Sequence, residues 1–413
     1  MNRIASLFAL VFATHVAAAE KTAETVTVPS SYQSLYDELG AKLAVFEKQI
    51  LAPEAKSPRP TVFSIELTAA NANRGETLLM PRARKGVSVN LDAFQALGVT
   101  GVTIATSFPI LAKDFPRSAE YLEFYKSVVD EVRHRGLKLH LKTGAAFVDP
   151  VFGHSPAAAY FKKLTPETYV TAKRAMVATI LRELKPDYLT VDNEPDTTQK
   201  NTGLDYSPDN YIRYVNAVTK GLERGKTKIA AGAGTWSPLV YFERLAKETD
   251  VDCIDLHIYL ISRDYLTGRL AEVSELGKKY HKSLIVGETW LYKVREEELG
   301  RVDFSYPAIF GRDIFSFWAP LDARFIGDIG RWSQAHGAEC VSFFWAQYLF
   351  GYVHYEAALD GKKPAEVQDL GARNAVPHIV AKEFSVSGQA IQKLTAASPS
   401  PASDARILLP GKG

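Results

Sequence analysis

The stretch 119–141, AEYLEFYKSVVDEVRHRGLKLHL, contains one complete helix-to-strand unit. Its first part, Ala119–Arg135, repeats apolar residues at the three- and four-residue spacing of an amphipathic helix. These residues are Tyr121, Leu122, Tyr125, Val128, Val129 and Val132. Gly136 is typical of a helix end, and the apolar run Leu137–Leu141 follows it. The stretch therefore predicts a helix followed at once by a buried strand, which is the repeating unit of an α/β protein.

The same alternation extends along most of the chain, with helical patterns such as Thr168–Leu184 and Pro208–Arg224 between short strand-like runs. The eight runs are Thr61–Leu67, Gly101–Ala105, Leu137–Leu141, Tyr188–Asp192, Lys228–Ala231, Cys253–Tyr259, Ser283–Glu288 and Cys340–Trp345. Most of them are near-continuously apolar, as expected for parallel strands buried on both faces. Eight such units favour a (β/α)8 barrel, an α/β fold. The alternative, a doubly wound open sheet, should carry a glycine-rich phosphate loop after its first strand, where this chain has Glu66-Leu67-Thr68-Ala69.

Composition excludes several classes of protein. The chain has 413 residues, of which 46% are hydrophobic and 23% charged, as in a soluble globular protein. Lys and Arg exceed Asp and Glu by only 49 − 47 = 2, and no long block of like charge occurs, so we expect no nucleic-acid partner. No Cys/His cluster has the spacing of metal ligands, so we expect neither a metal nor another cofactor.

Two cysteines, Cys253 and Cys340, fall in strand-like runs with one further strand between them. Two strand spacings of ~4.8 Å exceed the usual reach of a disulfide. We therefore expect both cysteines to be free and buried.

The ends of the chain suggest segments outside the barrel. Residues 1–19 combine an early Arg, an apolar run and three alanines, which is typical of a secretory signal peptide, although a buried helix is the alternative. We therefore expect a secreted or periplasmic protein with no later membrane span. Residues 20–57 are expected to form a helical extension and linker, because Leu35, Leu39, Leu43 and Phe46 recur at helical spacing. The barrel would occupy residues 58–396, and residues 397–413, rich in Ser, Pro, Ala and Gly, would form a mobile tail.

A glutamate stands at the end of two of the predicted strands. Residues 191–195 (VDNEP) end the fourth strand and residues 286–290 (VGETW) end the seventh, with 288 − 194 = 94 residues between Glu194 and Glu288. This interval corresponds to three strand–helix units of roughly 30 residues each. The ends of strands four and seven lie across the barrel mouth from one another. Two carboxylates in that arrangement are what the cleavage of a glycosidic bond requires.

These motifs resemble those of the retaining glycoside hydrolases of the (β/α)8-barrel clan A. That clan shares an Asn-Glu pair, often followed by Pro, at the end of strand four and a Glu at the end of strand seven. The resemblance covers residues 61 to 345 by order and spacing, but the second strand ends Thr106-Ser107-Phe108 without the Arg of some families, and no single family in the clan is matched. It implies an exported hydrolase of a β-linked glycan or glycoside, with Glu194 as acid/base and Glu288 as nucleophile of a double displacement.

Further residues are expected around an oligo- or polysaccharide substrate. The resemblance implies that Tyr259 donates a hydrogen bond to Glu288, with Thr289 as a weaker candidate, that His257 lies near the sugar and that Trp345 lies under it. Asn193 would bind the sugar 2-hydroxyl. The remaining candidates for substrate contact are Trp236, Trp290, Lys142, Thr143 and Glu66.

Other residues are given structural roles. We expect Trp318 and Trp332 to fill the core and His140 to point into the barrel. Asp192 remains an alternative carboxylate. Two other functions also stay open: a catalytically silent carbohydrate-binding barrel, and a transglycosylase that uses the same two carboxylates.

Overall fold

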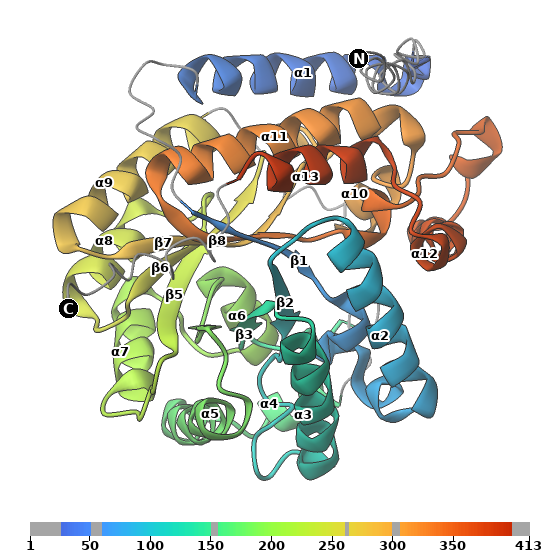
Figure 1. Cartoon of the computed structure of the whole chain (residues 1–413). Helices are drawn as coiled ribbons and strands as arrows, with labels where there is room; N and C mark the ends of the chain where they lie inside the picture. Colours follow the sequence, from blue (N-terminus) through green and yellow to red (C-terminus); the bar gives the residue numbers. More distant parts are fainter. Residues whose placement is uncertain (1–25, 51–59, 150–155, 261–263, 300–305, 399–413) are drawn as a thin grey trace, which may run out of the picture.

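Eight parallel strands close into a barrel in the order β1 to β8, so the predicted (β/α)8 fold is confirmed (Figure 1). The computed structural model describes residues 26–50, 60–149, 156–260, 264–299 and 306–398. The strands are β1 Val62–Glu66, β2 Gly101–Ala105, β3 Lys138–Lys142, β4 Tyr188–Thr190, β5 Lys228–Gly234, β6 Cys253–Tyr259, β7 Ser283–Trp290 and β8 Ala338–Phe343. All eight predicted strands are present, and β8 begins and ends two residues earlier than expected.

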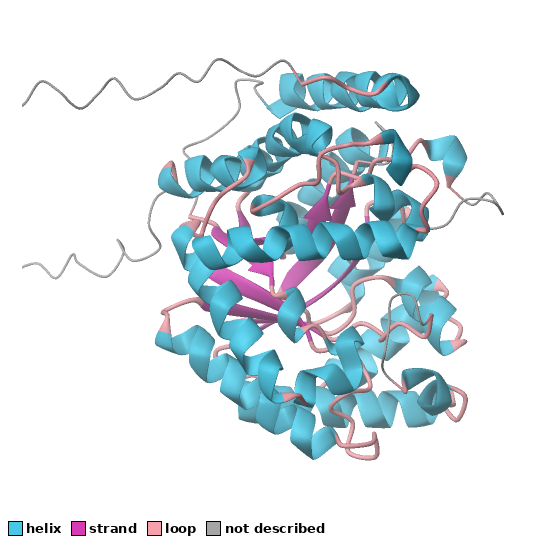
Figure 2. Ribbon diagram, turned by 90° about the vertical axis from the view of Figure 1, so that its right-hand side faces the viewer, coloured by secondary structure: helices cyan, strands magenta, loops and turns pink. Residues whose placement is uncertain are grey.

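Helices surround the strands on the outside of the barrel (Figure 2). They are α2 Pro81–Ala96, α3 Ser118–His134, α4 Ala157–Phe161, α5 Pro166–Thr179, α6 Pro195–Thr202, α7 Pro208–Thr219, α8 Leu239–Glu248, α9 Leu270–Tyr280, α10 Tyr306–Arg312, α11 Ala319–His336, α12 Pro364–Ala381 and α13 Val386–Ala396. The predicted helix 208–224 ends earlier, at Thr219, before Gly221 and Gly225, whose φ angles of 64° and 59° are left-handed. Trp318 and Trp332 are buried in the core, as expected.

An additional helix, α1 (Ser30–Ile50), lies alongside α11 on the outside of the barrel (Figure 1). Its predicted apolar face is buried, since Leu35, Leu39, Leu43 and Phe46 are each at most 2% exposed. The predicted signal peptide 1–19 lies outside the described residues, and the predicted tail 397–413 lies outside them except for its first two residues. Among the described helices, none combines the length and the hydropathy needed to cross a bilayer.

The two faces of each strand have different chemistry. In β1, Phe63 and Ile65 face the helices and belong to the main hydrophobic core. Val62, Ser64 and Glu66 alternate with these two residues along the strand and therefore face the barrel interior. The predicted burial of the strands on both faces is confirmed, and part of the inner face is polar.

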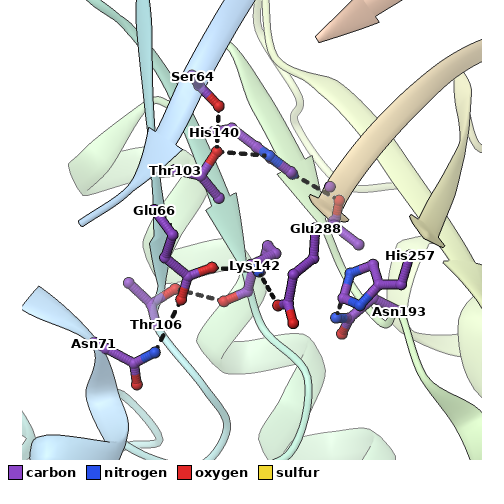
Figure 3. Close-up of polar contacts among 12 residues, drawn as sticks. Ser64, Glu66, Asn71, Thr103, Thr106, His140, Lys142, Asn193, His257 and Glu288 are labelled. Atoms are coloured by element: carbon purple, nitrogen blue, oxygen red, sulfur yellow. Dashed lines mark hydrogen bonds and ion pairs between the residues drawn. The ribbon is translucent and has the colours of Figure 1, made fainter. Parts of the chain in front are cut away.

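A layer of hydrogen-bonded polar side chains crosses the barrel interior (Figure 3). Ser64 Oγ lies 2.8 Å from Thr103 Oγ1, which lies 3.4 Å from His140 Nδ1. His140 Nε2 lies 2.8 Å from Thr190 Oγ1, and this hydroxyl donates to Asp255 Oδ2 at 2.7 Å. Buried polar groups are tolerated when they find such partners. His140 thus points into the barrel, as predicted.

An apolar cluster fills another part of the barrel interior and contains both cysteines. Its members are Val62, Ala230, Cys253, Ile285 and Cys340. Both thiols are free and buried, which confirms the prediction from strand spacing.

Candidate active site

The structure brings Glu194 and Glu288 together at the mouth of the barrel. Glu194 follows β4 and directly precedes α6, and Glu288 lies near the end of β7. One oxygen of each carboxylate and a ring nitrogen of His257 all lie within 4.8 Å of one another. The glutamate side chains remain 17% and 15% exposed, so both are accessible from the mouth. The predicted convergence of two residues 94 positions apart is therefore confirmed.

An irregularity in β7 places Glu288 in this position. Leu256 on β6 pairs with Val286, but the next residue, His257, pairs with Glu288, so Gly287 is an extra residue. The backbone N–H of Gly287 donates to Asp255 Oδ1 at 2.8 Å. The Asp255 carboxylate occupies the space beside Gly287, and a Cβ there would lie 2.3 Å from Oδ1. Only glycine fits this close approach.

This packing predicts the effect of Gly287→Ala. The new methyl group collides with a buried, hydrogen-bonded carboxylate, and overpacking of this kind costs roughly 1–3 kcal/mol. We expect a Tm lower by several degrees and reduced activity in any assay that depends on Glu288. Gly86→Ala in α2 is the matched control, because nothing lies within 4 Å of its added Cβ. Equal Tm values for the two variants would contradict this explanation.

Both oxygens of Glu288 accept hydrogen bonds. Lys142 Nζ donates to Oε2 at 2.6 Å, and the Tyr259 hydroxyl donates to Oε1, as predicted for Tyr259. Thr289 instead donates to the Ile258 carbonyl at 2.8 Å. Burial alone would raise the pKa of Glu288, but the positive charge of Lys142, the charge that His257 carries when it is protonated and the two donors hold that pKa below its usual value. Glu288 is therefore ionised at neutral pH, as a carboxylate nucleophile must be.

Lys142 lies between two carboxylates (Figure 3). Its Nζ is 2.6 Å from Glu66 Oε2 and 2.6 Å from Glu288 Oε2, and Asn71 Nδ2 donates to Glu66 Oε1 at 2.9 Å. Burial would lower the pKa of Lys142, but the two carboxylates raise it. Burial raises the pKa of Glu66, which Lys142 and Asn71 only partly offset. The lysine side chain is 3% exposed, so its position is that of an ion-pair partner within the site.

Glu194 has a different environment. His257 Nδ1 lies 2.7 Å from Glu194 Oε1, and His257 Nε2 lies 2.9 Å from Asn193 Nδ2. The neutral tautomer with hydrogen on Nδ1 satisfies both contacts, since it donates to Glu194 and accepts from Asn193. Burial would lower the pKa of His257, but the charges of Glu288 and Glu194 raise it above the usual value. In the described part of the chain, no side chain hydrogen-bonds Oε2 of Glu194.

The two carboxylates are thus suited to different roles. Glu288 accepts on both oxygens and lies beside an ammonium ion, which favours the ionised form. Glu194 is engaged through one oxygen only, which leaves the other able to carry a proton toward a bound molecule. A pair of carboxyl groups with contrasting environments supplies one acid and one base. The pair can therefore perform acid–base and nucleophilic chemistry on one substrate.

Asp192, the alternative carboxylate, is not part of this pair. It is 4% exposed, and its Oδ2 accepts from Tyr169 at 3.3 Å and from Tyr206 at 3.1 Å. Its Oδ1 accepts from Thr198 Oγ1 at 3.0 Å. Asp192 therefore anchors the segment that carries Glu194 rather than facing the mouth.

The aromatic candidates have different degrees of access. Trp236 is partly buried, lies 5.9 Å from the Tyr259 ring and donates from Nε1 to Asp196 at 2.9 Å. Trp345 is also partly buried and lies 5.2 Å from the Phe310 ring. Both can offer a ring face to a sugar.

Trp290 does not support its predicted role. Its side chain is only 1% exposed and packs 6.0 Å from the Tyr348 ring, while Lys293 Nζ lies 5.4 Å from its centroid. Its predicted position at the end of β7 is confirmed, but the side chain points into the packing between β7 and the segment after β8. It offers no face to a sugar.

Glu194, His257 and Glu288 together could contribute three ligand atoms to a metal ion. However, Lys142 and Tyr259 already donate to both oxygens of Glu288, and His257 Nδ1 is hydrogen-bonded to Glu194. An ammonium ion 2.6 Å from a ligand oxygen would repel a cation. The arrangement therefore fits acid–base chemistry better than metal binding.

No protein-family model matches the sequence, and no curated protein matches it either. Solved structures do match the fold. A GH5_18 variant from Bifidobacterium longum subsp. longum in complex with Manβ1-4GlcNAc has a TM-score of 0.55 at 14% identity, covering 82% of this chain and 80% of that one. A GH5_18 structure from Streptomyces cattleya in complex with GlcNAc has a TM-score of 0.55 at 12% identity, covering 84% and 83%.

An exo-β-1,4-mannosidase from Opitutaceae bacterium strain TAV5 has a TM-score of 0.54 at 12% identity. The match covers 82% of this chain but only 60% of the mannosidase. At such low identities these similarities establish that the chain shares the barrel fold of these proteins.

Proposed function

We propose that the protein is a retaining glycoside hydrolase that acts on a β-linked glycan or glycoside. The observation that carries the proposal is that one carboxylate oxygen of Glu194 lies within 4.8 Å of one carboxylate oxygen of Glu288. Retaining enzymes hold their carboxyl groups ~5–5.5 Å apart, whereas inverting enzymes need ~6.5–9.5 Å to admit a water molecule. The short separation favours direct attack by one carboxylate.

The proposed reaction has two steps. Glu194 transfers a proton to the leaving oxygen while Glu288 attacks the anomeric carbon, which forms a glycosyl ester. Glu194, now ionised, then accepts a proton from water. The water oxygen bonds to the anomeric carbon and the Glu288 carboxylate departs. Tyr259 and Lys142, which donate to Glu288, stabilise the charge that returns to it.

Two observations guide the choice of substrate. Structurally similar proteins have been solved with Manβ1-4GlcNAc or GlcNAc, and another is an exo-β-1,4-mannosidase. Trp236 is partly buried beside Tyr259, which donates to Glu288, and Trp345 is partly buried just after β8. Aromatic side chains suit the apolar C–H face of a sugar ring. We therefore propose β-linked mannosides as the first substrates to test, together with β-glucosides and N-acetyl-β-glucosaminides.

We further propose that the protein is exported after removal of residues 1–19, on the basis of their signal-peptide pattern. N-terminal sequencing of protein secreted or recovered from a periplasmic fraction tests this. An N-terminus at Glu20 is expected, and an intact Met1 on protein retained in the cytoplasm would contradict export.

A panel of chromogenic aryl glycosides tests the proposed activity. Turnover of at least one β-glycoside is expected, with the corresponding α-glycoside inert. Saturable sugar binding without turnover would instead favour the carbohydrate-binding barrel. If an added alcohol captures most of the glycosyl group at low concentration, the transglycosylase alternative is favoured.

A further inference from the structure

We propose that Lys142 and Glu66 form a charge-balancing pair that controls the reactivity of Glu288. Lys142 is assigned as a positioning residue for the nucleophile, and Glu66 as the counter-ion that limits its effect. This inference rests on the proposed glycosidase function and identifies residues that act on the nucleophile without bonding to the sugar.

The geometry of the three residues leaves Lys142 few donors for a substrate. Its ammonium group has three N–H bonds, and Nζ lies 2.6 Å from both Glu66 Oε2 and Glu288 Oε2. The Phe344 ring centroid lies 5.9 Å from the same nitrogen. The side chains of Lys142 and Glu66 are 3% and 1% exposed, whereas Glu288 is 15% exposed. Only the nucleophile end of the trio is therefore open to the mouth.

Charge counting explains why two carboxylates share one lysine. In the free protein, Glu66 and Glu288 each carry −1 and Lys142 carries +1, so the trio has a net charge of −1. When Glu288 becomes a glycosyl ester its charge disappears, and Lys142 and Glu66 remain as a neutral pair. A buried charge without a partner is costly. Glu66 therefore keeps Lys142 paired during the stage in which Glu288 cannot.

The two partners have opposite effects on the two steps. The charge of Lys142 stabilises the Glu288 carboxylate, so it assists the second step, in which that carboxylate leaves. The same stabilisation makes Glu288 a weaker nucleophile in the first step. Because Lys142 also pairs with Glu66, it stabilises the Glu288 carboxylate less, and Glu288 remains a better nucleophile. We therefore expect removal of Lys142 to slow the second step and removal of Glu66 to slow the first step.

Several other groups also face Glu288, and the variants below leave them unchanged. Tyr259 and His257 come from β6, and Glu194 comes from the segment after β4.

The test uses Lys142→Met and Glu66→Gln in the full-length protein, with an aryl glycoside that the wild type hydrolyses. In Lys142→Met, no cation stabilises the Glu288 carboxylate as it leaves the sugar, so the second step is slowed. We expect a steady-state rate lower by about 10²-fold, preceded by a burst of aryl alcohol from the first step. Glu288 also loses a nearby positive charge, so its pKa rises. As the pH is lowered, Glu288 is therefore protonated, and activity is lost, at a higher pH than in the wild type. We expect the acidic limb of kcat/KM to move up by about one pH unit or more.

Glu66→Gln is expected to behave in the opposite way. The full charge of Lys142 then acts on Glu288, which slows the first step, removes any burst and moves the acidic limb down or leaves it unchanged. Lys138→Met is the matched control on the same strand, because Lys138 pairs with Asp187 and its side chain is 52% exposed. We expect the control to have wild-type rates and pH dependence.

Three outcomes would overturn the inference: a Lys142→Met protein with a wild-type acidic limb, a Lys142→Met protein without a burst, or equal losses in both steps for both variants. If Lys142→Met does not fold, the neutral double variant Glu66→Gln/Lys142→Met takes its place, with a raised acidic limb expected. Titration of the Glu288 carboxyl group followed by ¹³C NMR measures the same change in its pKa and does not require turnover. If the Glu288 pKa rises in Lys142→Met but the wild type cleaves no glycoside, only the proposed function is refuted. If the wild type is active and the Glu288 pKa is unchanged in Lys142→Met, the role of Lys142 is refuted.

Discussion

Replacing Glu288 with alanine is expected to reduce kcat/KM on a cleavable β-glycoside by on the order of 10⁴- to 10⁶-fold, as for the loss of other hydrolase nucleophiles. The reason is that, among the residues that the structure describes, no other carboxylate is placed to attack from the same side. Asp192 is held by Tyr169, Tyr206 and Thr198, and Glu66 is buried behind Lys142. Steady-state kinetics on the best aryl glycoside measure the loss.

An external nucleophile sharpens this test. Alanine leaves space beside the anomeric carbon on the side that Glu288 occupied, so azide can attack from there. From a β-glycoside the expected product is the α-glycosyl azide, with inverted configuration. Glu339→Ala is the matched control, because Glu339 lies on β8 and pairs with Lys228 outside the site. A Glu288→Ala protein that retains more than about a tenth of wild-type activity would contradict the assignment, because loss of one catalytic group alone costs about 10²-fold or more.

Replacing Glu194 with alanine is expected to have the second largest effect, and its size should depend on the leaving group. General acid catalysis contributes about 10²- to 10⁴-fold, so cleavage of a sugar–sugar bond should fall by that amount. A nitrophenolate leaves without a proton, so the first step on an activated aryl glycoside should be nearly unchanged. The second step still needs the base, and the glycosyl-enzyme should therefore accumulate.

Azide again distinguishes the roles. In Glu194→Ala it replaces the activated water and attacks the glycosyl-enzyme, which should restore turnover and give the β-glycosyl azide with retained configuration. Thr197→Ala, three residues along the same segment, is the control for general disturbance of α6. Equal losses on activated and unactivated substrates would argue against Glu194 as the acid.

Much of the fold could be predicted because its signals are local. The helix pattern with Tyr121 and Val132 and the Gly136 break lie within one stretch of chain, and the structure has α3 and β3 there. The order of eight such units was enough to predict the barrel. The polar layer of Ser64, Thr103 and Thr190 was missed because short polar residues in apolar runs do not reveal their partners, although their two-residue alternation with apolar neighbours was a signal.

The residues of the site that belong to motifs at the strand ends could be predicted from the sequence. Glu194, Glu288 and the Tyr259 contact followed from position and resemblance, whereas the pairing of Lys142 with Glu66 and Glu288 depends on three strands distant in sequence. A lysine at the end of a buried strand does require acidic partners, and that signal was available. The burial of Trp290 depends on its packing against Tyr348, which no local pattern reports.

The most direct test of the account is to trap the covalent intermediate. A 2-deoxy-2-fluoro derivative of the best β-glycoside should inactivate the protein by forming a slowly hydrolysed ester. Proteolysis and tandem mass spectrometry should then locate the glycosyl group on Glu288, and incubation with an acceptor alcohol should restore activity. Labelling of any other residue, or an initial product of inverted anomeric configuration by ¹H NMR, would contradict a retaining pair formed by Glu194 and Glu288.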